Sequence, residues 1–204
     1  MSYLKKIEYE IVPRESFRVI RNCSGCGRKA YFTNTKKFRV NANGNRLDVW
    51  LIYQCEKCRH TLNLTIYERQ RPASIPGEEY RRFLSNDEQL AEAYGRDIQL
   101  FKKNKAEVDC DGPAYDYVKQ AGSDASIAEA AESGSGDRVM LTIRNPYGMR
   151  IRPEKQIAEV LGLSRSQVQK RMQEGNIELE SASPHFLSAY VHCGSVDLLE
   201  AGKC

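Results

Sequence analysis

The sequence predicts an α+β protein: an N-terminal antiparallel zinc ribbon with a helical extension, followed by a small helix-loop-helix plus strand module. Three observations lead to this prediction. Two Cys-x-x-Cys pairs lie among short β-like runs, apolar residues recur at helical spacing after the second pair, and two short capped helices are indicated near the C-terminus. We expect the ribbon over residues 1–72, the helical extension over 73–121, a linker over 122–136 and the module with its tail over 137–204.

The two cysteine pairs are the strongest chemical signal in the chain. In the first, Cys23 precedes Cys26, and 28 residues later Cys55 precedes Cys58. Cysteines separated by two residues can bind one ion with both sulfurs at about 2.3 Å, and two such pairs complete a tetrahedral shell without an open position. We therefore predict a structural Zn²⁺ ion held by all four. A redox dithiol is the alternative to a metal site, iron is the alternative to zinc, and His60 is a possible substitute ligand.

The segments around the cysteines have the composition of β-strands. Residues 9–20 alternate enough to suggest strands that turn at 13–15, and residues 62–67 alternate between apolar and polar. Residues 38–40 and 47–53 are β-branched and aromatic runs joined through Asn43-Gly44, a step that favours a hairpin turn. These runs predict a three-stranded antiparallel ribbon that brings the second cysteine pair back to the first.

The segment after Pro72 and Pro76 has helical periodicity. Its apolar residues between 78 and 105 predict two helices divided near residues 85–87, with Ser85 or Asn86 capping the second. Residues 114–121 are expected to form a short helix. Residues 122–136 are rich in Ala, Ser, Gly and acidic residues, a composition typical of a linker.

Composition and charge limit the class of protein. A chain of 204 residues with 41% hydrophobic and 28% charged residues suits one or two globular domains. Residues 14–71 carry 13 Lys and Arg against 4 Asp and Glu, whereas residues 78–137 carry 7 against 14, so the first segment is a candidate anion-binding face. No apolar run approaches the roughly 18 residues of a membrane span and residues 1–6 lack a signal core, so we expect a soluble cytoplasmic protein.

Residues 152–177 contain the second informative pattern. Pro153 suits the first turn of a helix, Gly162 ends that helix, Ser164 caps a second one and Gly175 ends it. Apolar residues on both helices form one buried seam. A pair of helices of this kind can present one helix to a nucleic acid.

This stretch resembles the RNA-binding domain typified by ribosomal protein S-four. The family's pattern is matched by ten residues: Arg152, Glu154, Lys155, Ile157, Ser164, Arg165, Val168, Met172, Gly175 and Ile177. The chain departs from that pattern at Pro153 and after Leu179, where Glu180-Ser181 replaces the family's usual Asn-Gly turn. The resemblance implies that the RNA phosphates are contacted by five basic residues: Arg152, Lys155, Arg165, Lys170 and Arg171.

The N-terminal half is also similar to a bacterial family catalogued as domain of unknown function 1062. The similarity lies in residues 37–43, residues 47–53 and the cysteine pair that follows them. It implies a bacterial cytosolic protein and nearly full coverage of the chain. It assigns no activity.

Together these patterns predict a zinc-ribbon protein that binds structured RNA without catalysis. Enzyme signatures are missing from the sequence: it has no phosphate-binding Gly-rich loop, no recognisable nucleophile elbow and only 3 His. Aromatic residues of the ribbon are candidates to stack on bases, although such residues are more often core: Tyr31, Phe32, Trp50 and Tyr53. A DNA-binding regulator of the helix-turn-helix type and a protein-interaction adaptor are the alternatives. The oligomeric state is left open.

Overall fold

The structure, a computed structural model, describes residues 5–121 and 138–192 and divides into two compact units. Residues 13–114 form one unit, which we call the cysteine unit, and residues 5–12, 115–121 and 138–192 form the other, which we call the terminal unit. The domain boundaries expected at 72 and 121 differ from this division. The reason is that the first strand pairs with residues 139–144, on the far side of the expected linker, and the helices after Pro72 pack on the strands that precede them. The expected linker, 122–136, lies outside the described residues.

The cysteine unit is built on a five-stranded antiparallel sheet of order β5-β4-β3-β2-β6. The ribbon was expected to have three strands, and the structure corrects this number: residues 19–23 pair with β3 as a fourth strand, and residues 107–108 add a fifth beside residues 19–20. The Asn43-Gly44 hairpin is confirmed, with Gly44 at φ +61°. The strands are β2 (Val19–Cys23), β3 (Arg28–Asn43), β4 (Arg46–Cys55), β5 (Thr61–Gln70) and β6 (Glu107–Val108).

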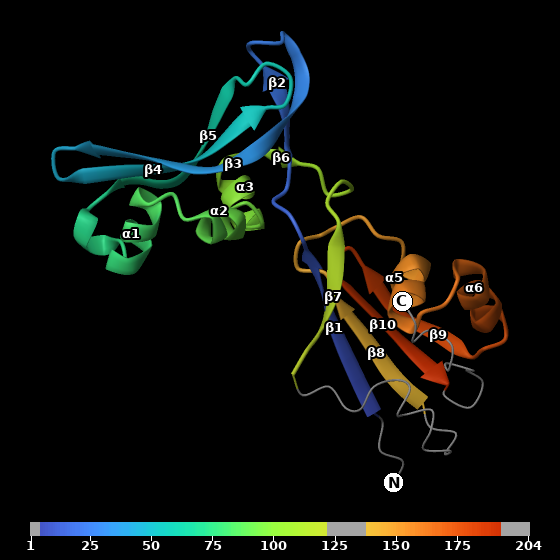
Figure 1. Cartoon of the computed structure of the whole chain (residues 1–204). Helices are drawn as coiled ribbons and strands as arrows, with labels where there is room; N and C mark the ends of the chain where they lie inside the picture. Colours follow the sequence, from blue (N-terminus) through green and yellow to red (C-terminus); the bar gives the residue numbers. More distant parts are fainter. Residues whose placement is uncertain (1–4, 122–137, 193–204) are drawn as a thin grey trace. The chain divides into compact units, whose positions relative to one another are not determined.

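Three helices cover one face of this sheet (Figure 1), and a short 3₁₀ turn precedes them in the chain. Two helices were expected. Gly95 ends the second helix after seven residues, and Asp97 then caps a third by accepting the backbone N–H of Gln99. The cap of the second helix is Asp87, not Ser85 or Asn86. These elements are η1 (Pro72–Ser74), α1 (Gly77–Leu84), α2 (Glu88–Tyr94) and α3 (Ile98–Lys103).

Aromatic rings form the core between the sheet and its helices. Phe38 packs edge-on against Phe83 at 4.9 Å between ring centroids, and Tyr53 packs edge-on against Phe101 at 6.2 Å. Tyr53 and Phe32 are buried, so neither is open to a base, whereas Tyr31 is 42% exposed and Trp50 is partly exposed. Of the four aromatic residues considered for stacking on bases, only Tyr31 and Trp50 are therefore accessible to a base.

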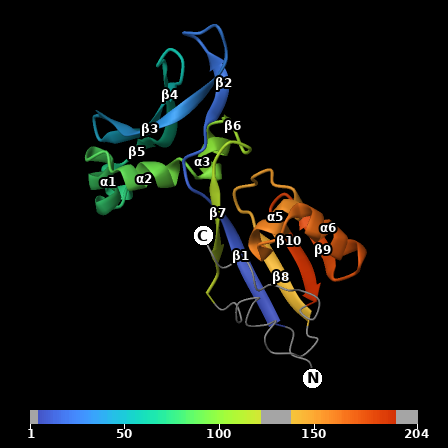
Figure 2. The same cartoon turned by 45° about the vertical axis from the view of Figure 1, so that its right-hand side comes forward.

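The terminal unit contains a mixed sheet of order β7-β1-β8-β10-β9 with two helices over it (Figure 2). The first strand runs parallel to β8, and β10 lies between β8 and β9. Residues 115–119 form a strand, within the segment 114–121 where a short helix was expected. The strands are β1 (Lys5–Pro13), β7 (Tyr115–Lys119), β8 (Arg138–Arg144), β9 (Ile177–Ser183) and β10 (Phe186–His192).

The helices α5 (Pro153–Leu161) and α6 (Arg165–Gln173) form as their cap residues predict. Gly162 ends α5 in the left-handed region at φ +66°, a conformation that glycine adopts without strain. Ser164 Oγ accepts the backbone N–H of Gln167, and the Gln167 side chain accepts the N–H of Ser164, which completes a capping box. The helices of the described residues include none with the length and apolarity needed to cross a membrane.

Candidate metal centre

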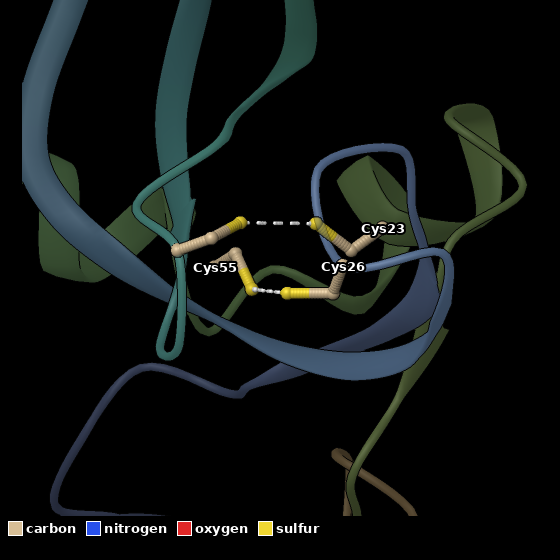
Figure 3. A group of neighbouring side chains, drawn as sticks. Cys23, Cys26 and Cys55 are labelled. Atoms are coloured by element: carbon tan, nitrogen blue, oxygen red, sulfur yellow. Dashed lines mark hydrogen bonds between the residues drawn. The ribbon is translucent and has the colours of Figure 1, made fainter.

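The four cysteines predicted as ligands meet at one end of the sheet in the cysteine unit. Cys23 is the last residue of β2 and Cys55 the last residue of β4, and each strand is followed by a tight turn that carries the second cysteine of its pair. Figure 3 shows Cys23 and Cys26 facing Cys55 across the gap between the two turns. The pairing of β2 and β4 with β3 brings the turns together, although 28 residues separate them in sequence.

The distances between the sulfur atoms fit a metal site. All four Sγ atoms lie within 4.8 Å of one another, and none of these cysteines is in a disulfide. Sγ of Cys23 lies 3.4 Å from that of Cys58, and Sγ of Cys26 lies 3.8 Å from that of Cys55. Four sulfurs placed tetrahedrally about one ion at 2.3 Å would lie about 3.8 Å apart. The cluster is therefore consistent with a metal ion bound by four thiolates.

Backbone N–H groups support the first thiolate of each pair. The N–H groups of Cys58 and Lys57 point at Cys55 and lower the pKa of its thiol to about 6. Burial raises the pKa of Cys23, while the N–H groups of Cys26 and Gly25 act in the opposite direction. Hydrogen bonding to the Cys58 thiol, together with burial, raises the pKa of Cys26 to about 12. Thiols this close cannot all ionise unless a cation lies among them.

Glycine makes the first turn compact enough for this cluster. A Cβ atom at Gly25 would lie 2.9 Å from Sγ of Cys58, so only glycine allows the turn to approach the second pair so closely. His60 does not join the cluster, because its Nε2 lies 2.8 Å from Oγ of Ser24. The substitute ligand considered from the sequence is thus engaged elsewhere.

The five predicted RNA-contacting residues lie on or beside α5 and α6 in different environments. Arg152 precedes α5 and Arg165 begins α6; both are exposed, and neither has an ion-pair partner within residues 5–121 and 138–192. Lys155 pairs with Glu159 at 3.6 Å and lies over the ring of Tyr115. The other two are Lys170, which pairs with Glu174 at 3.8 Å, and Arg171, which is half-buried with no hydrogen-bond partner for Nη1.

Two features of the charged surface were missed from the sequence. Glu159 accepts hydrogen bonds from both Tyr115 and Tyr117, at 2.8 and 2.9 Å, which attaches β7 to α5. Arg39 lies beside Trp50 on the face of the sheet that the helices leave open. The alternation of Lys37-Phe38-Arg39-Val40 carried the signal for the second feature, because Phe38 faces the core and its neighbours must face away.

Fold and cluster together define a mixed α+β protein, rich in β-strand, with four clustered cysteines consistent with a metal site. Residues 40–183 match the family described as protein of unknown function (DUF1062), and the chain belongs to this family. The match includes Cys55 and Cys58 and extends over parts of both units. Comparison with curated proteins and with solved structures gave no significant match to either.

Proposed function

We propose that the protein binds structured RNA without catalysis and that its cysteine unit is stabilised by one structural Zn²⁺ ion. The metal part is supported by four sulfurs within 4.8 Å of one another, with backbone N–H groups that point at the thiols of Cys23 and Cys55. Four thiolates fill the coordination shell of zinc and leave no position for a substrate or a reactive water. Such a site stabilises a fold and does not catalyse a reaction.

The proposal of RNA binding depends on one observation, the position and charge environment of Arg152 and Arg165. Each guanidinium lies at the start of a helix, is exposed, and has no carboxylate partner among the described residues. Unfilled backbone N–H groups in the first turn of a helix add a further attraction for phosphate. Two arginines placed in this way are suited to the sugar-phosphate backbone of a folded RNA.

The other three basic residues would contribute less. The phenol of Tyr115 and the carboxylate of Glu159 raise the pKa of Lys155, so its charge is retained but is already partly neutralised. Lys170 shares its charge with Glu174. We therefore expect binding to depend chiefly on Arg152 and Arg165.

Cross-linking in the host cell tests this proposal. RNA cross-linked to the wild-type protein is sequenced and compared with that recovered by Arg152→Ala/Arg165→Ala. The matched control is Arg138→Ala/Arg144→Ala, which removes the same charge from β8. There Arg138 is ion-paired with Glu178, and Arg144 is ion-paired with Glu8. Structured RNA enriched with the wild type and the control, and lost with the first variant, is the expected result.

The same experiment has outcomes that contradict the proposal. Equal recovery by the wild type and Arg152→Ala/Arg165→Ala would remove the helix pair as the RNA site. A preference for duplex DNA would indicate a DNA-binding regulator instead. No recovered nucleic acid at all would indicate that the partner is a protein.

A further inference from the structure

The sheet of the cysteine unit has an open face with a charge pattern of its own. Side chains alternate along β3 and β4, so Phe38 and Leu51 are buried under the helices while Arg39 and Trp50 face the other way. A groove of about 590 Å³ follows this open face. Its lining includes Lys37, Arg39, Ile52, Gln54, Arg59 and Asn63.

The groove carries positive charge that the protein does not neutralise. Lys37, Arg39 and Arg59 have no ion-pair partner among the residues that the structure describes, and no described acidic residue lines the groove. The next residue along the chain is different: Lys36 pairs with Glu92 at 2.8 Å and with Glu88 at 3.4 Å. Of these two neighbouring lysines, only Lys36 is ion-paired, whereas Lys37 lines the groove together with Arg39 and Arg59.

Groups suited to bases lie in the groove and beside it. Trp50 adjoins the groove without lining it: it is the cross-strand neighbour of Arg39, whose guanidinium lies 5.8 Å from the centroid of the indole ring. The side-chain amides of Gln54 and Asn63 make no hydrogen bond to any described residue. Amide groups without partners can both donate to and accept from the edges of bases.

We propose that this groove binds a single-stranded segment of RNA. Lys37, Arg39 and Arg59 contact phosphates, and one base stacks on Trp50. A base can reach the indole only when it is unpaired, whereas the phosphates alone would attract any strand. The choice of RNA rests on the proposed function, but the groove lies in the cysteine unit and its residues differ from those of α5 and α6.

Trp50 makes the test specific, because it is the only tryptophan in the chain. The zinc-loaded full-length protein is titrated with a short oligouridylate while its intrinsic fluorescence is recorded. We expect saturable quenching that weakens as salt is raised. Lys37→Gln/Arg39→Gln/Arg59→Gln should lower the affinity at least about tenfold and reduce the slope of log K against log salt by about 2, since each phosphate contact on a single strand contributes about 0.7.

Two controls separate a specific groove from general charge. Lys29→Gln/Lys36→Gln/Lys102→Gln removes three charges from exposed positions outside the groove and should bind like the wild type. Trp50→Leu, followed by anisotropy of labelled RNA, should lower the affinity roughly 5- to 100-fold, whereas Trp50→Phe should recover part of the loss. Circular dichroism and zinc content confirm that each variant is folded.

Three outcomes would contradict the proposal that this groove binds RNA. They are no quenching of Trp50 fluorescence by oligouridylate at low salt, quenching by polyglutamate equal to that by oligouridylate, and equal affinity of the two triple variants for oligouridylate. The groove and the proposed function can also fail separately. If oligouridylate leaves Trp50 unchanged while Arg152→Ala/Arg165→Ala still loses structured RNA, only the groove is wrong. If Arg152→Ala/Arg165→Ala recovers as much structured RNA as the wild type while oligouridylate quenches Trp50, only the helix-pair site is wrong.

Discussion

Gly27 and Arg59 occupy equivalent positions in the two cysteine turns. Each residue follows the second cysteine of its pair, and each has a left-handed backbone, with φ +65° at Gly27 and +63° at Arg59. The N–H of Gly27 donates to the carbonyl oxygen of Cys23 at 2.8 Å, and the N–H of Arg59 donates to that of Cys55 at 3.0 Å. One backbone geometry is thus repeated, with glycine in one turn and a strained arginine in the other.

Arg59→Gly should stabilise the cysteine unit. Because a residue with a Cβ atom is strained in the left-handed region, the substitution should raise the free energy of unfolding by about 0.5–1 kcal/mol. Urea denaturation of the zinc-loaded protein measures the change. Gly27→Arg should move the midpoint the opposite way, and Arg59→Gln, which keeps the strain but removes the charge, should stay near the wild type. A lower midpoint for Arg59→Gly would contradict the equivalence of the two turns.

Cys55→Ser should abolish metal binding. We expect one zinc ion per chain in the wild type and almost none in the variant, since a serine hydroxyl is a poor replacement for a thiolate. The apparent binding free energy of structural zinc is about 10–16 kcal/mol, so a chelator should unfold the cysteine unit. Metal analysis and circular dichroism check both results. Cys110→Ser is the matched control, because Cys110 is outside the cluster. A red colour of the purified protein would identify the metal as iron instead of zinc.

The parts of the structure that were predicted correctly depend on short stretches of sequence. The spacing within each cysteine pair, the cap at Ser164 and the left-handed Gly162 each require only a few neighbouring residues. The clustering of the four sulfurs also follows from spacing, because the Asn43-Gly44 hairpin returns the chain to its starting point. Local rules therefore sufficed for the cysteine cluster and for the helix pair.

The parts that were missed depend on partners far away in sequence. Residues 114–121 were expected to be helical, yet Tyr115 and Tyr117 both donate hydrogen bonds to Glu159. Side chains two residues apart point to the same side of a strand, whereas on a helix they point in different directions. Pairing of β1 with β8 joins Lys5 to Val139 and likewise has no local signal. Tyr and Val near Tyr115 favour a strand, but the partner Glu159 lies 44 residues away in sequence.

Glu159→Ala should weaken the attachment of β7 to α5. The substitution removes the acceptor of two phenol hydrogen bonds and the ion-pair partner of Lys155, and we expect a loss of about 1–2 kcal/mol because the pair is partly exposed. Hydrogen exchange in β7, which should become faster, and the urea midpoint, which should fall, measure this loss of stability. Glu174→Ala, which breaks only the ion pair to Lys170, should change the midpoint little. Tyr115→Phe/Tyr117→Phe should reproduce the effect, and exchange in β7 equal to that of the wild type would show that Glu159 does not hold the strand.

The same tyrosines should make the terminal unit sensitive to alkali. Burial and the Glu159 carboxylate raise the pKa of Tyr117 above its ordinary value of 10.0. The unfolded chain therefore loses this proton first, so the stabilisation is complete below pH 10 and is lost as the pH rises through the higher folded pKa. Urea midpoints followed by circular dichroism should fall above about pH 10, and less steeply in Tyr117→Phe. An unchanged slope in Tyr117→Phe would show that the Tyr117 phenol is not the source of the pH dependence.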